Sequence, residues 1–342
     1  MQRFKEGDIV FFAEDNQTRK SSVFFNPERK WDRDLNVLLA ESIGAKEMDG
    51  IDLFSSSGIR GLRLASETGV FRSMLLNDIK THKILTRNVR LNKDRIRCAL
   101  KISSFNASRL RCIDGVYDYI DIDPFGSPVR YILDAVCKLR LGGIMAITAT
   151  DTAALYGKAK KACMLRYGST SMKTSYFNEL GLRILIKRSE ELANIQERSV
   201  EPVFFDVRRH YIRVYLRICK PRSGVQTGFF YQCSRCPNRS RELMEKCDVC
   251  GKKMVQIGPI WLGGLLDKQV LRKMSVIAEE DTVKRHLGRL LSEKDKIVSY
   301  YTTTELASYK RKPERPVSYF YDRTIFNPKG FKTNKSLKEL SY

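Results

Sequence analysis

Short apolar runs alternate with amphipathic segments between about residue 50 and residue 150 of the chain. The apolar runs have the length of buried strands and lie at 51–54, 74–76, 100–103, 117–122 and 144–148. The intervening segments predict three helices, at 60–68, 82–92 and 128–139. An earlier segment, 31–45, has apolar residues at helical spacing and predicts a fourth helix. Strands that alternate with helices form a parallel sheet covered on both faces, so the pattern predicts an α/β fold.

Two later apolar runs, 203–207 and 211–219, are separated by only three residues and predict a β-hairpin. The composition changes after this hairpin, where residues 220–224 combine Lys, Pro, Arg, Ser and Gly in the manner of a linker. We therefore divide the chain into a first domain, 1–220, which includes an N-terminal segment over 1–49, and a second domain, 221–342.

Positive charge dominates the sequence, with 62 Lys and Arg against 39 Asp and Glu and a formal net charge of +23. Such a chain attracts polyanions, because each phosphate that Lys or Arg neutralises releases a condensed counterion. Residues 221–342 hold 24 Lys and Arg against 13 Asp and Glu, so the charge is denser in the second domain. We expect that domain to bind nucleic acid.

Membranes and secretion fit the sequence less well. No stretch approaches the roughly 20 apolar residues that a spanning helix needs. The first 15 residues lack the apolar centre of a secretory signal, and they contain acids that a mitochondrial presequence avoids. We expect a protein of the nucleus or cytoplasm that is neither secreted nor bound to a membrane.

Four of the nine cysteines form two C-x-x-C pairs, Cys233 with Cys236 and Cys247 with Cys250. Two such pairs at close spacing are typical of a tetrahedral Cys₄ zinc site in a zinc ribbon. Four thiolate ligands leave no open position for water, so the expected zinc is structural. The alternative is a set of redox-active thiols. The other cysteines are interpreted as small buried hydrophobes.

The strand predicted at 51–54 runs into a turn of small residues within 52–61, which includes Asp52, Ser57 and Arg60. Such a turn lets a ligand approach the backbone at the carboxyl edge of the sheet. It lacks the G-x-G-x-x-G pattern, which disfavours NAD. Asp78, followed by Ile79, ends the next strand, where a carboxylate can accept hydrogen bonds from both hydroxyls of a ribose. The alternatives are a structural turn and a helix cap.

Residues 121–128 read DIDPFGSP and follow a buried strand. Methylation of an exocyclic amine requires hydrogen-bond acceptors for the amine, because its lone pair is delocalised into the ring, and a flat surface for the base. Asp123 offers a carboxylate, Pro124 a backbone carbonyl and Phe125 a stacking ring. The segment resembles the Asp/Asn-Pro-Pro-aromatic motif of amino-methyltransferases that act on nucleic-acid bases. A tight turn without chemistry is the alternative.

These motifs occur in one order along the chain together with further segments, and the full set lies at 23–27, 33–35, 57–60, 77–79, 121–128, 148–151 and 258–263. The whole resembles the tRNA guanine-26 N2-dimethyltransferase family over residues 5–333. The resemblance implies a Rossmann-like class I methyltransferase domain followed by an α+β tRNA-binding domain with the zinc ribbon at 233–250. It also implies the transfer of one or two methyl groups from S-adenosylmethionine to N2 of guanosine 26 in tRNA.

The family resemblance also assigns roles to residues. Arg33 is expected at the methionine carboxylate of the cofactor and Asp78 at its ribose, and the full set expected at the cofactor is Arg33, Asp52, Ser57, Arg60, Asp78, Ile79, Asn106 and Ala107. The family usually has an acid where Asn106 stands. In the expected reaction the base is flipped and stacks between Phe24 and Phe125, while Asp123 accepts from N2 and Pro124 lies beside it.

Two other functions are compatible with these residues. The chain could be another RNA base-amine methyltransferase, acting on guanine N2 in rRNA or on adenine N6. It could also be a non-enzymatic tRNA-binding protein on a methyltransferase scaffold, although Asp78, Asp123 and Phe125 argue against that. We expect the protein to act as a monomer.

Overall fold

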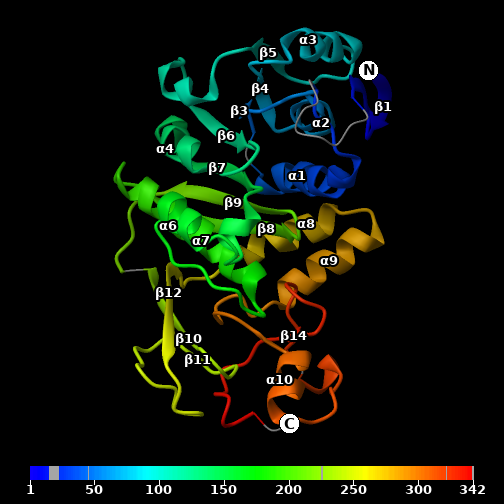
Figure 1. Ribbon diagram of the computed structural model, residues 1–342. Coiled ribbons are helices and arrows are strands. Elements are labelled where there is room, and N and C mark those ends of the chain that lie inside the picture. Colours follow the sequence, from blue (N-terminus) through cyan, green and yellow to red (C-terminus); the bar gives the residue numbers. More distant parts are fainter. Residues whose placement is uncertain (15–22, 45, 225, 321, 341–342) are drawn as a thin grey trace.

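The computed structural model describes residues 1–14, 23–44, 46–224, 226–320 and 322–340 (Figure 1). The first part of the chain forms β1 (Gln2–Glu6), β2 (Ile9–Ala13), η1 (Pro27–Arg29), α1 (Lys30–Ile43), β3 (Met48–Asp52), α2 (Ile59–Glu67), β4 (Phe71–Asn77), α3 (His82–Leu91), β5 (Ala99–Ser103), η2 (Ala107–Cys112), β6 (Tyr117–Ile122), α4 (Val129–Lys138), β7 (Leu139–Ala149), α5 (Thr152–Leu155), α6 (Lys160–Tyr167), α7 (Phe177–Asn194), β8 (Ser199–Arg208) and β9 (Tyr211–Cys219). The second part forms β10 (Thr227–Cys233), β11 (Arg239–Ser240), β12 (Met254–Trp261), α8 (Lys268–Ile277), α9 (Asp281–Ser292), β13 (Tyr301–Thr302), α10 (Thr303–Lys310), η3 (Val317–Phe320) and β14 (Gly330–Phe331).

The main sheet of the described chain has seven strands in the order β5-β4-β3-β6-β7-β9-β8. The strands from β5 to β7 are parallel, and the hairpin of β8 and β9 adds two antiparallel strands at one edge. The predicted α/β fold and the predicted hairpin are therefore confirmed. Several boundaries differ by a few residues. In particular, β3 begins at Met48 and ends at Asp52, so Phe54 lies in the turn that follows it.

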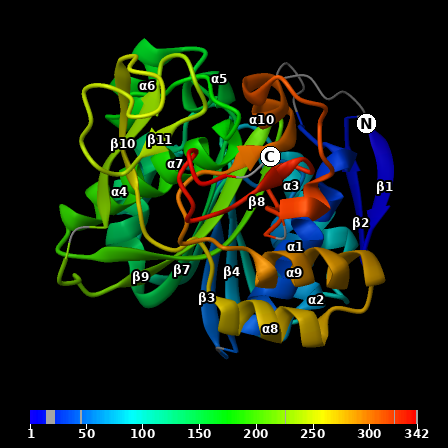
Figure 2. The ribbon, with the colours of Figure 1, turned by 90° about the horizontal axis from the view of Figure 1, so that it is seen from below.

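Helices cover both faces of this sheet, with α1, α2 and α3 on one side and α4 and α7 on the other (Figure 2). The central strands are therefore buried on both faces, and Ile120 and Asp121 of β6, whose side chains point to opposite faces, are fully buried. This explains why the strands read as nearly continuous apolar runs rather than as alternating ones. The arrangement leaves the carboxyl ends of β3, β4 and β6 as the place where loops converge.

The second part of the chain packs in two places. Helix α8 lies against α1, and Trp261, Leu271 and Leu287 belong to the same hydrophobic core as the main sheet. The antiparallel sheet β11-β10-β12, together with α10 and the chain end, forms a lobe below the main body with its own buried cluster (Figure 1). Residues after 221 therefore cover the sheet domain as well as building the lobe.

A buried group of charges fastens the end of the chain to α7. The Nζ of Lys332 lies 3.0 Å from Glu179 and 3.2 Å from Glu293, and Arg183 pairs with Glu179 at 2.8 Å. Thr324 donates a hydrogen bond to Glu293. Burial of these charges costs free energy that only their mutual pairing offsets, so the cluster fixes the position of every segment that contributes to it.

None of the helices in the described part of the chain is both long and apolar enough to cross a membrane.

Candidate active site

A cavity of about 1250 Å³ opens at the carboxyl ends of β3, β4 and β6. Its wall is built by loops of the main sheet, the segment before α1, the β8–β9 turn and α9. Of the residues predicted for cofactor or base, those that line the cavity are Phe24, Arg33, Asp52, Ser57, Arg60, Asp78, Ile79, Asp123, Pro124 and Phe125. The structure thus brings together side chains that are up to about 100 positions apart in the sequence.

Asp52 ends β3 and is buried at the base of this cavity. Its Oδ2 atom is buried and accepts no hydrogen bond from any described residue. Burial, together with the nearby carboxylate of Asp121, raises the pKa of Asp52 to about 7. An acceptor in this state fits a cationic or hydrogen-bond-donating ligand.

The turn after β3 holds the neighbouring groups in place. Ser56 and Gly58 both have a positive φ, +48° and +84°, which lets the chain reverse tightly before α2. The Ser56 amide donates to Asp78 at 3.0 Å, and Asp78 also accepts from the amides of Lys80 and Thr81. Asp78 therefore caps the turn before α3 and also lines the wall of the cavity. Ile79 beside it is 58% exposed, an apolar surface turned outward at the cavity.

Asp123 is held by two arginines. Arg29 approaches its carboxylate to 2.8 Å and Arg60 to 3.1 Å. Burial alone would raise the pKa of Asp123, but the guanidinium groups of Arg29 and Arg60 outweigh it and lower that pKa. The carboxylate is consequently ionised and fixed in position at neutral pH.

These contacts belong to a buried network of three arginines and three aspartates among the described residues, namely Arg29, Arg60, Arg213, Asp32, Asp121 and Asp123. The charges balance, and Asp52 adds a fourth carboxylate to them. Sequence reasoning missed Arg29, Asp32 and Arg213. For Arg213 a signal existed, because it is a fully buried charge inside the apolar strand β9.

The two arginines expected at the cofactor are engaged within the protein. Arg33 donates to the carboxylate of Glu6, with 2.7 Å between Nε and Oε1, and to the backbone carbonyl of Asn26. Arg60 pairs with Asp32 at 2.7 Å as well as with Asp123. Both line the cavity, so a ligand would meet guanidinium groups whose orientation is already set.

Phe24 and Phe125 face each other at the cavity. Their ring centroids are 5.0 Å apart and their planes are nearly perpendicular, at 83°. At this spacing the rings touch edge to face, so a base could enter between them only after one ring moves. Phe125 is 53% exposed and is the less constrained of the two.

Asn106 and Ala107 are not among the residues that line the cavity. The side chain of Asn106 accepts from the Ser108 amide at 3.0 Å and caps η2. This position follows β5, which neighbours β4 at the sheet edge. Their expected contact with the adenine of a cofactor stays a prediction.

Part of the wall was not expected from the sequence. It comes from the start of α1, the β8–β9 turn and α9, and it contributes Trp31, Arg208, Arg209, His210, Tyr211, Thr282, Arg285, His286 and Arg289. Helix α9 belongs to the second part of the chain, and no local pattern indicated that it would close a cavity in the first.

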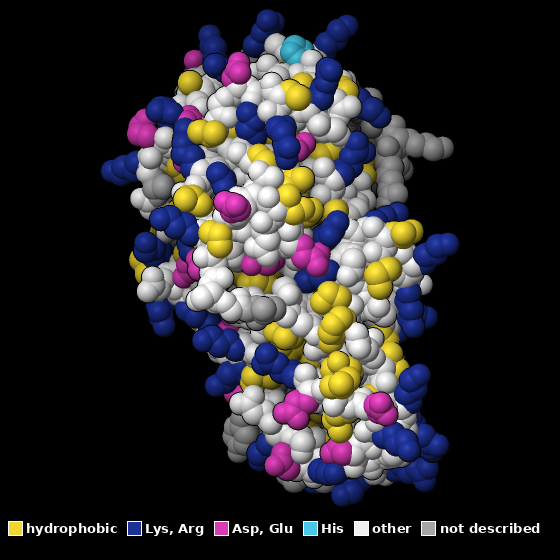
Figure 3. Space-filling view, turned by 90° about the vertical axis from the view of Figure 1, so that its left-hand side faces the viewer, with side chains coloured by type: hydrophobic (Ala, Val, Ile, Leu, Met, Phe, Trp, Pro, Cys, Tyr) yellow, Lys and Arg dark blue, Asp and Glu magenta, His cyan; other side chains and the backbone are white. Residues whose placement is uncertain are grey.

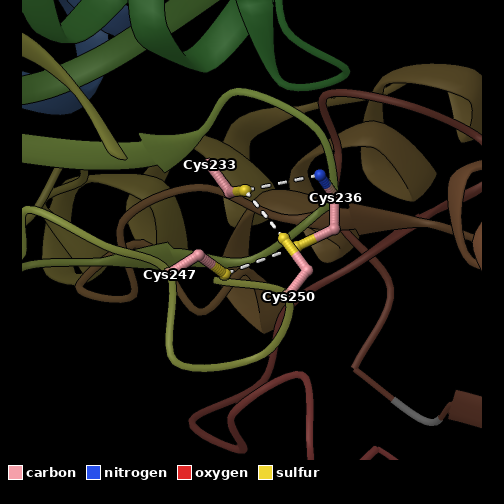
Figure 4. Close-up of side chains that lie close together, drawn as sticks. All are labelled: Cys233, Cys236, Cys247 and Cys250. Atoms are coloured by element: carbon pink, nitrogen blue, oxygen red, sulfur yellow. Dashed lines mark hydrogen bonds between the residues drawn. The ribbon is translucent and has the colours of Figure 1, made fainter. Parts of the chain in front are cut away.

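The four predicted zinc ligands also come together, in the lobe (Figure 4). Their sulfur atoms all lie within 4.8 Å of one another, with Cys233 and Cys250 3.5 Å apart and Cys236 and Cys247 3.6 Å apart. Four sulfurs at 2.3 Å from a tetrahedral zinc ion would be separated by about 3.8 Å. The donor set therefore fits the metal.

Hydrogen bonds to sulfur support the same arrangement. The amides of Arg235 and Cys236 both donate to Cys233, and Asn238 donates to Cys247. For Cys247 burial is outweighed by backbone and side-chain donors, which lower its pKa to about 7, whereas burial raises the pKa of Cys233 and Cys236. Donors aimed at sulfur are typical of thiolate ligands.

Comparison with known proteins gives one consistent result. A family model described as N2,N2-dimethylguanosine tRNA methyltransferase matches residues 6–342. The tRNA (guanine(26)-N(2))-dimethyltransferase of Metallosphaera sedula is 31% identical over 94% of this chain and 88% of its own. The tRNA (guanine(26)-N(2)/guanine(27)-N(2))-dimethyltransferase of Aquifex aeolicus is 34% identical over 93% of this chain and 88% of its own.

A solved structure agrees with these relatives. Trm1 from Pyrococcus horikoshii, determined in complex with S-adenosyl-L-methionine, superposes with a TM-score of 0.86 and 25% identity. The superposition covers 98% of this chain and 97% of that one, so the expected Rossmann-like fold with a second α+β part is confirmed along the whole length. The chain belongs to the N2,N2-dimethylguanosine tRNA methyltransferase family.

Proposed function

We propose that this protein transfers methyl groups from S-adenosylmethionine to N2 of guanosine 26 in tRNA. One observation carries the proposal: the Asp52 turn and the segment Asp123-Pro124-Phe125 open into one cavity at the carboxyl edge of the sheet. The turn expected to bind the cofactor and the segment expected to bind the base therefore face the same cavity. The family membership and the named relatives support the substrate.

The cavity suits a cationic cofactor. The buried network balances three guanidinium groups against three carboxylates, and Asp52 is the acid in excess, with an unpartnered Oδ2 among the described residues. S-adenosylmethionine carries a sulfonium and an ammonium charge, and when bound it supplies an electrophilic methyl group. We assign Asp52 to the positive charges of this cofactor and Asp78 to its ribose. We assign Ser57 and Ile79 to the adjoining wall of the cofactor site. Arg33 and Arg60 are assigned to the side of the cavity that faces the cofactor's carboxylate.

We assign the target amine to Asp123 and the carbonyl of Pro124. A carboxylate has about four acceptor sites, and Arg29 and Arg60 occupy only part of them. Acceptors on both N–H bonds of the amine turn its lone pair out of the ring. Because Asp123 has a lowered pKa, it acts as a fixed acceptor rather than as a strong base. The rate gain then comes mainly from positioning and from a preorganised charge.

The two phenylalanines act as the clamp for the flipped base. Phe24 and Phe125 lie in edge-to-face contact and would have to part to admit a base. An aromatic clamp contributes about 1–3 kcal/mol per stacked base.

Charge outside the cavity supports an RNA substrate. Lys and Arg side chains outnumber acidic ones on the face shown in Figure 3, over the main body and the lobe alike. We assign the residues after 221 to tRNA binding and a structural zinc ion to the four cysteines. The ion would join the β10 and β12 ends of the lobe, where the apolar core is small.

Labelled S-adenosylmethionine and tRNA transcripts test this function. We expect label in the wild-type transcript, none in a transcript with adenosine at position 26, and a loss of at least a hundredfold in the Asp123→Asn variant. Asparagine keeps the shape of the side chain but removes the charge that fixes the amine. Equal label in both transcripts would overturn the target nucleotide, and an unaffected variant would overturn the role of Asp123.

A further inference from the structure

The cavity wall contributed by α1, the β8–β9 turn and α9 has no role in the reaction described above. We call it the α9 wall and define it by Trp31, Arg208, Arg209, Arg285, His286 and Arg289. Figure 1 shows α9 beside α8, which packs on α1, and the contact of the Trp31 and His286 rings joins the start of α1 to α9. The cavity exceeds the roughly 300–1,000 Å³ of pockets that hold one small ligand, so there is room beyond a cofactor and a single base.

Cations gather on this wall without matching acids. Among the described residues, no carboxylate forms an ion pair with Arg209, Arg285 or Arg289, while Arg208 pairs with Asp206 at 3.0 Å. All four arginines are exposed at the cavity. Like charges held together on one surface repel one another unless an anion joins them, and the anion that tRNA offers is phosphate.

Two buried polar atoms lie in the same wall. Nε1 of Trp31 and Nε2 of His286 are buried and have no hydrogen-bond partner among the described residues. Their rings meet edge to face with centroids 5.2 Å apart, and the Arg208 guanidinium lies 5.7 Å from the Trp31 ring. Burial, Arg208 and Arg289 lower the pKa of His286 to about 4, so its ring is neutral at pH 7.

Buried polar groups in folded proteins nearly always have partners, so these two unpaired nitrogen atoms are free to pair with a ligand once a rotation of either ring uncovers them to the cavity. A donor N–H from Trp31 beside a neutral imidazole suits a heteroaromatic base, which carries donors and acceptors on its edge. Unpaired arginines next to that place suit the phosphates of the same nucleotide. Aromatic rings alternating with cations are the usual design of single-strand nucleic-acid sites.

We propose that the α9 wall binds the nucleotide adjacent to the methylated guanosine, with Arg209, Arg285 and Arg289 at its phosphates and Trp31 and His286 at its base. The inference rests on the proposed function and deepens it. It gives α9 a part in the function of the first part of the chain. The α9 wall holds the tRNA strand next to the target guanosine while the base of that guanosine is flipped out of its stack. The site is a binding site, and none of its residues touches the reacting atoms.

Charge variants on α9 provide the first test. Arg285→Ala combined with Arg289→Ala is compared with Lys284→Ala, which removes an exposed cation from the same helix but does not line the cavity. We expect the double variant to lose about 10- to 100-fold in kcat/KM for tRNA, mainly through KM, and to flatten the salt dependence of tRNA binding by about 1.4–1.8 in log–log slope. Lys284→Ala should stay within about twofold. An equal effect of both would overturn the site.

A coupling experiment tests the base. Transcripts lacking the base at position 25 or at position 27 are assayed with wild type and with Trp31→Phe, which keeps a ring but removes the N–H donor. We expect one of the two transcripts to lose about tenfold with wild type and to lose little more with the variant, because both changes remove the same contact. Independent losses at both positions would refute the proposal.

Binding of fluorescent tRNA is measured beside methyl transfer in every case. Absence of methyl transfer by wild type would count against the proposed function. The coupling between Trp31→Phe and the missing base, measured in tRNA binding, would still show whether the α9 wall binds the adjacent nucleotide. The three variants should bind S-adenosylmethionine with the affinity of wild type. A loss of this affinity would mean that the variants act through the cofactor site and that the assignment of the α9 wall is wrong.

Discussion

Replacement of Asp52 by asparagine should change how cofactor affinity depends on pH. The side chain is buried, its Oδ2 has no hydrogen-bond partner among the described residues, and burial with the Asp121 carboxylate raises its pKa to about 7. A cationic cofactor requires the ionised form. Below pH 7 the carboxyl must therefore lose a proton before it can pair, and this reduces affinity.

The size of the effect follows from that pKa. Between pH 8 and pH 6 the ionised fraction of Asp52 falls by about tenfold, so the wild-type affinity should fall by about the same factor. At pH 8 the loss of a charged hydrogen-bond partner costs about 1.5–3 kcal/mol, which is about 10- to 150-fold in Kd for Asp52→Asn. The ratio of the two dissociation constants should accordingly shrink about tenfold at pH 6.

Isothermal titration calorimetry with S-adenosylmethionine at pH 6, 7 and 8 measures this ratio. The ratio is informative because a titration of the cofactor itself affects both proteins equally. Measurements in two buffers at pH 6 should also show release of about 0.9 protons per cofactor bound by wild type. Asp78→Asn is the matched control, since it removes a carboxylate from the same cavity and leaves Asp52 in place. A ratio that is constant from pH 6 to pH 8 would refute the reasoning.

Three other expectations concern stability and metal. Elemental analysis should find one zinc per chain, lost in Cys247→Ser but kept in Cys219→Ser, whose thiol lies outside the four-cysteine cluster; zinc in neither protein would contradict the assignment. Lys332→Met should lower the free energy of unfolding in urea by about 3–5 kcal/mol, because Glu293 would stay buried without its cation and Glu179 would keep only Arg183. Exposed Lys335→Met should change it by less than about 0.5 kcal/mol. Burial lowers the folded-state pKa of His286 from 6.5 to about 4, so the unfolded chain binds the extra proton and stability falls as pH drops through this window. Between pH 7.5 and pH 5 the wild type should lose about 2 kcal/mol more than His286→Gln in urea unfolding, and parallel curves would show that the ring is not buried as a neutral group.

The main sheet could be predicted from the sequence because each strand is a local signal. Apolar runs bounded by turn residues gave all five parallel strands and the hairpin of β8 and β9. The predicted boundary is wrong where the apolar run is interrupted, as in β7, which extends from Leu139 through two glycines to Ala149 rather than starting at 144. Pairing with neighbouring strands, which no local pattern contains, decides such ends.

The candidate site was predictable only where a motif is continuous in the sequence. The turn after Asp52 and the segment around Asp123 are of this kind, and both line the cavity. The arginines that hold Asp123 are not, since Arg29 is 94 positions away and its partner is set by tertiary packing. The same holds for α9, whose amphipathic pattern indicates a buried face but not the surface that it covers.

Helix α9 and Lys332 lie late in the sequence, and this affects how the protein folds during translation. A ribosome delivers the cofactor turn and Asp123 first, but the cavity gains its last wall only with residues 281–292, and the buried charges on α7 are paired only when residue 332 has emerged. During the intervening synthesis Glu179 and Arg183 have no complete set of partners. The nascent chain is therefore expected to gain catalytic competence late, and translation arrest before that point would yield fragments for chaperones and proteases rather than a smaller methyltransferase.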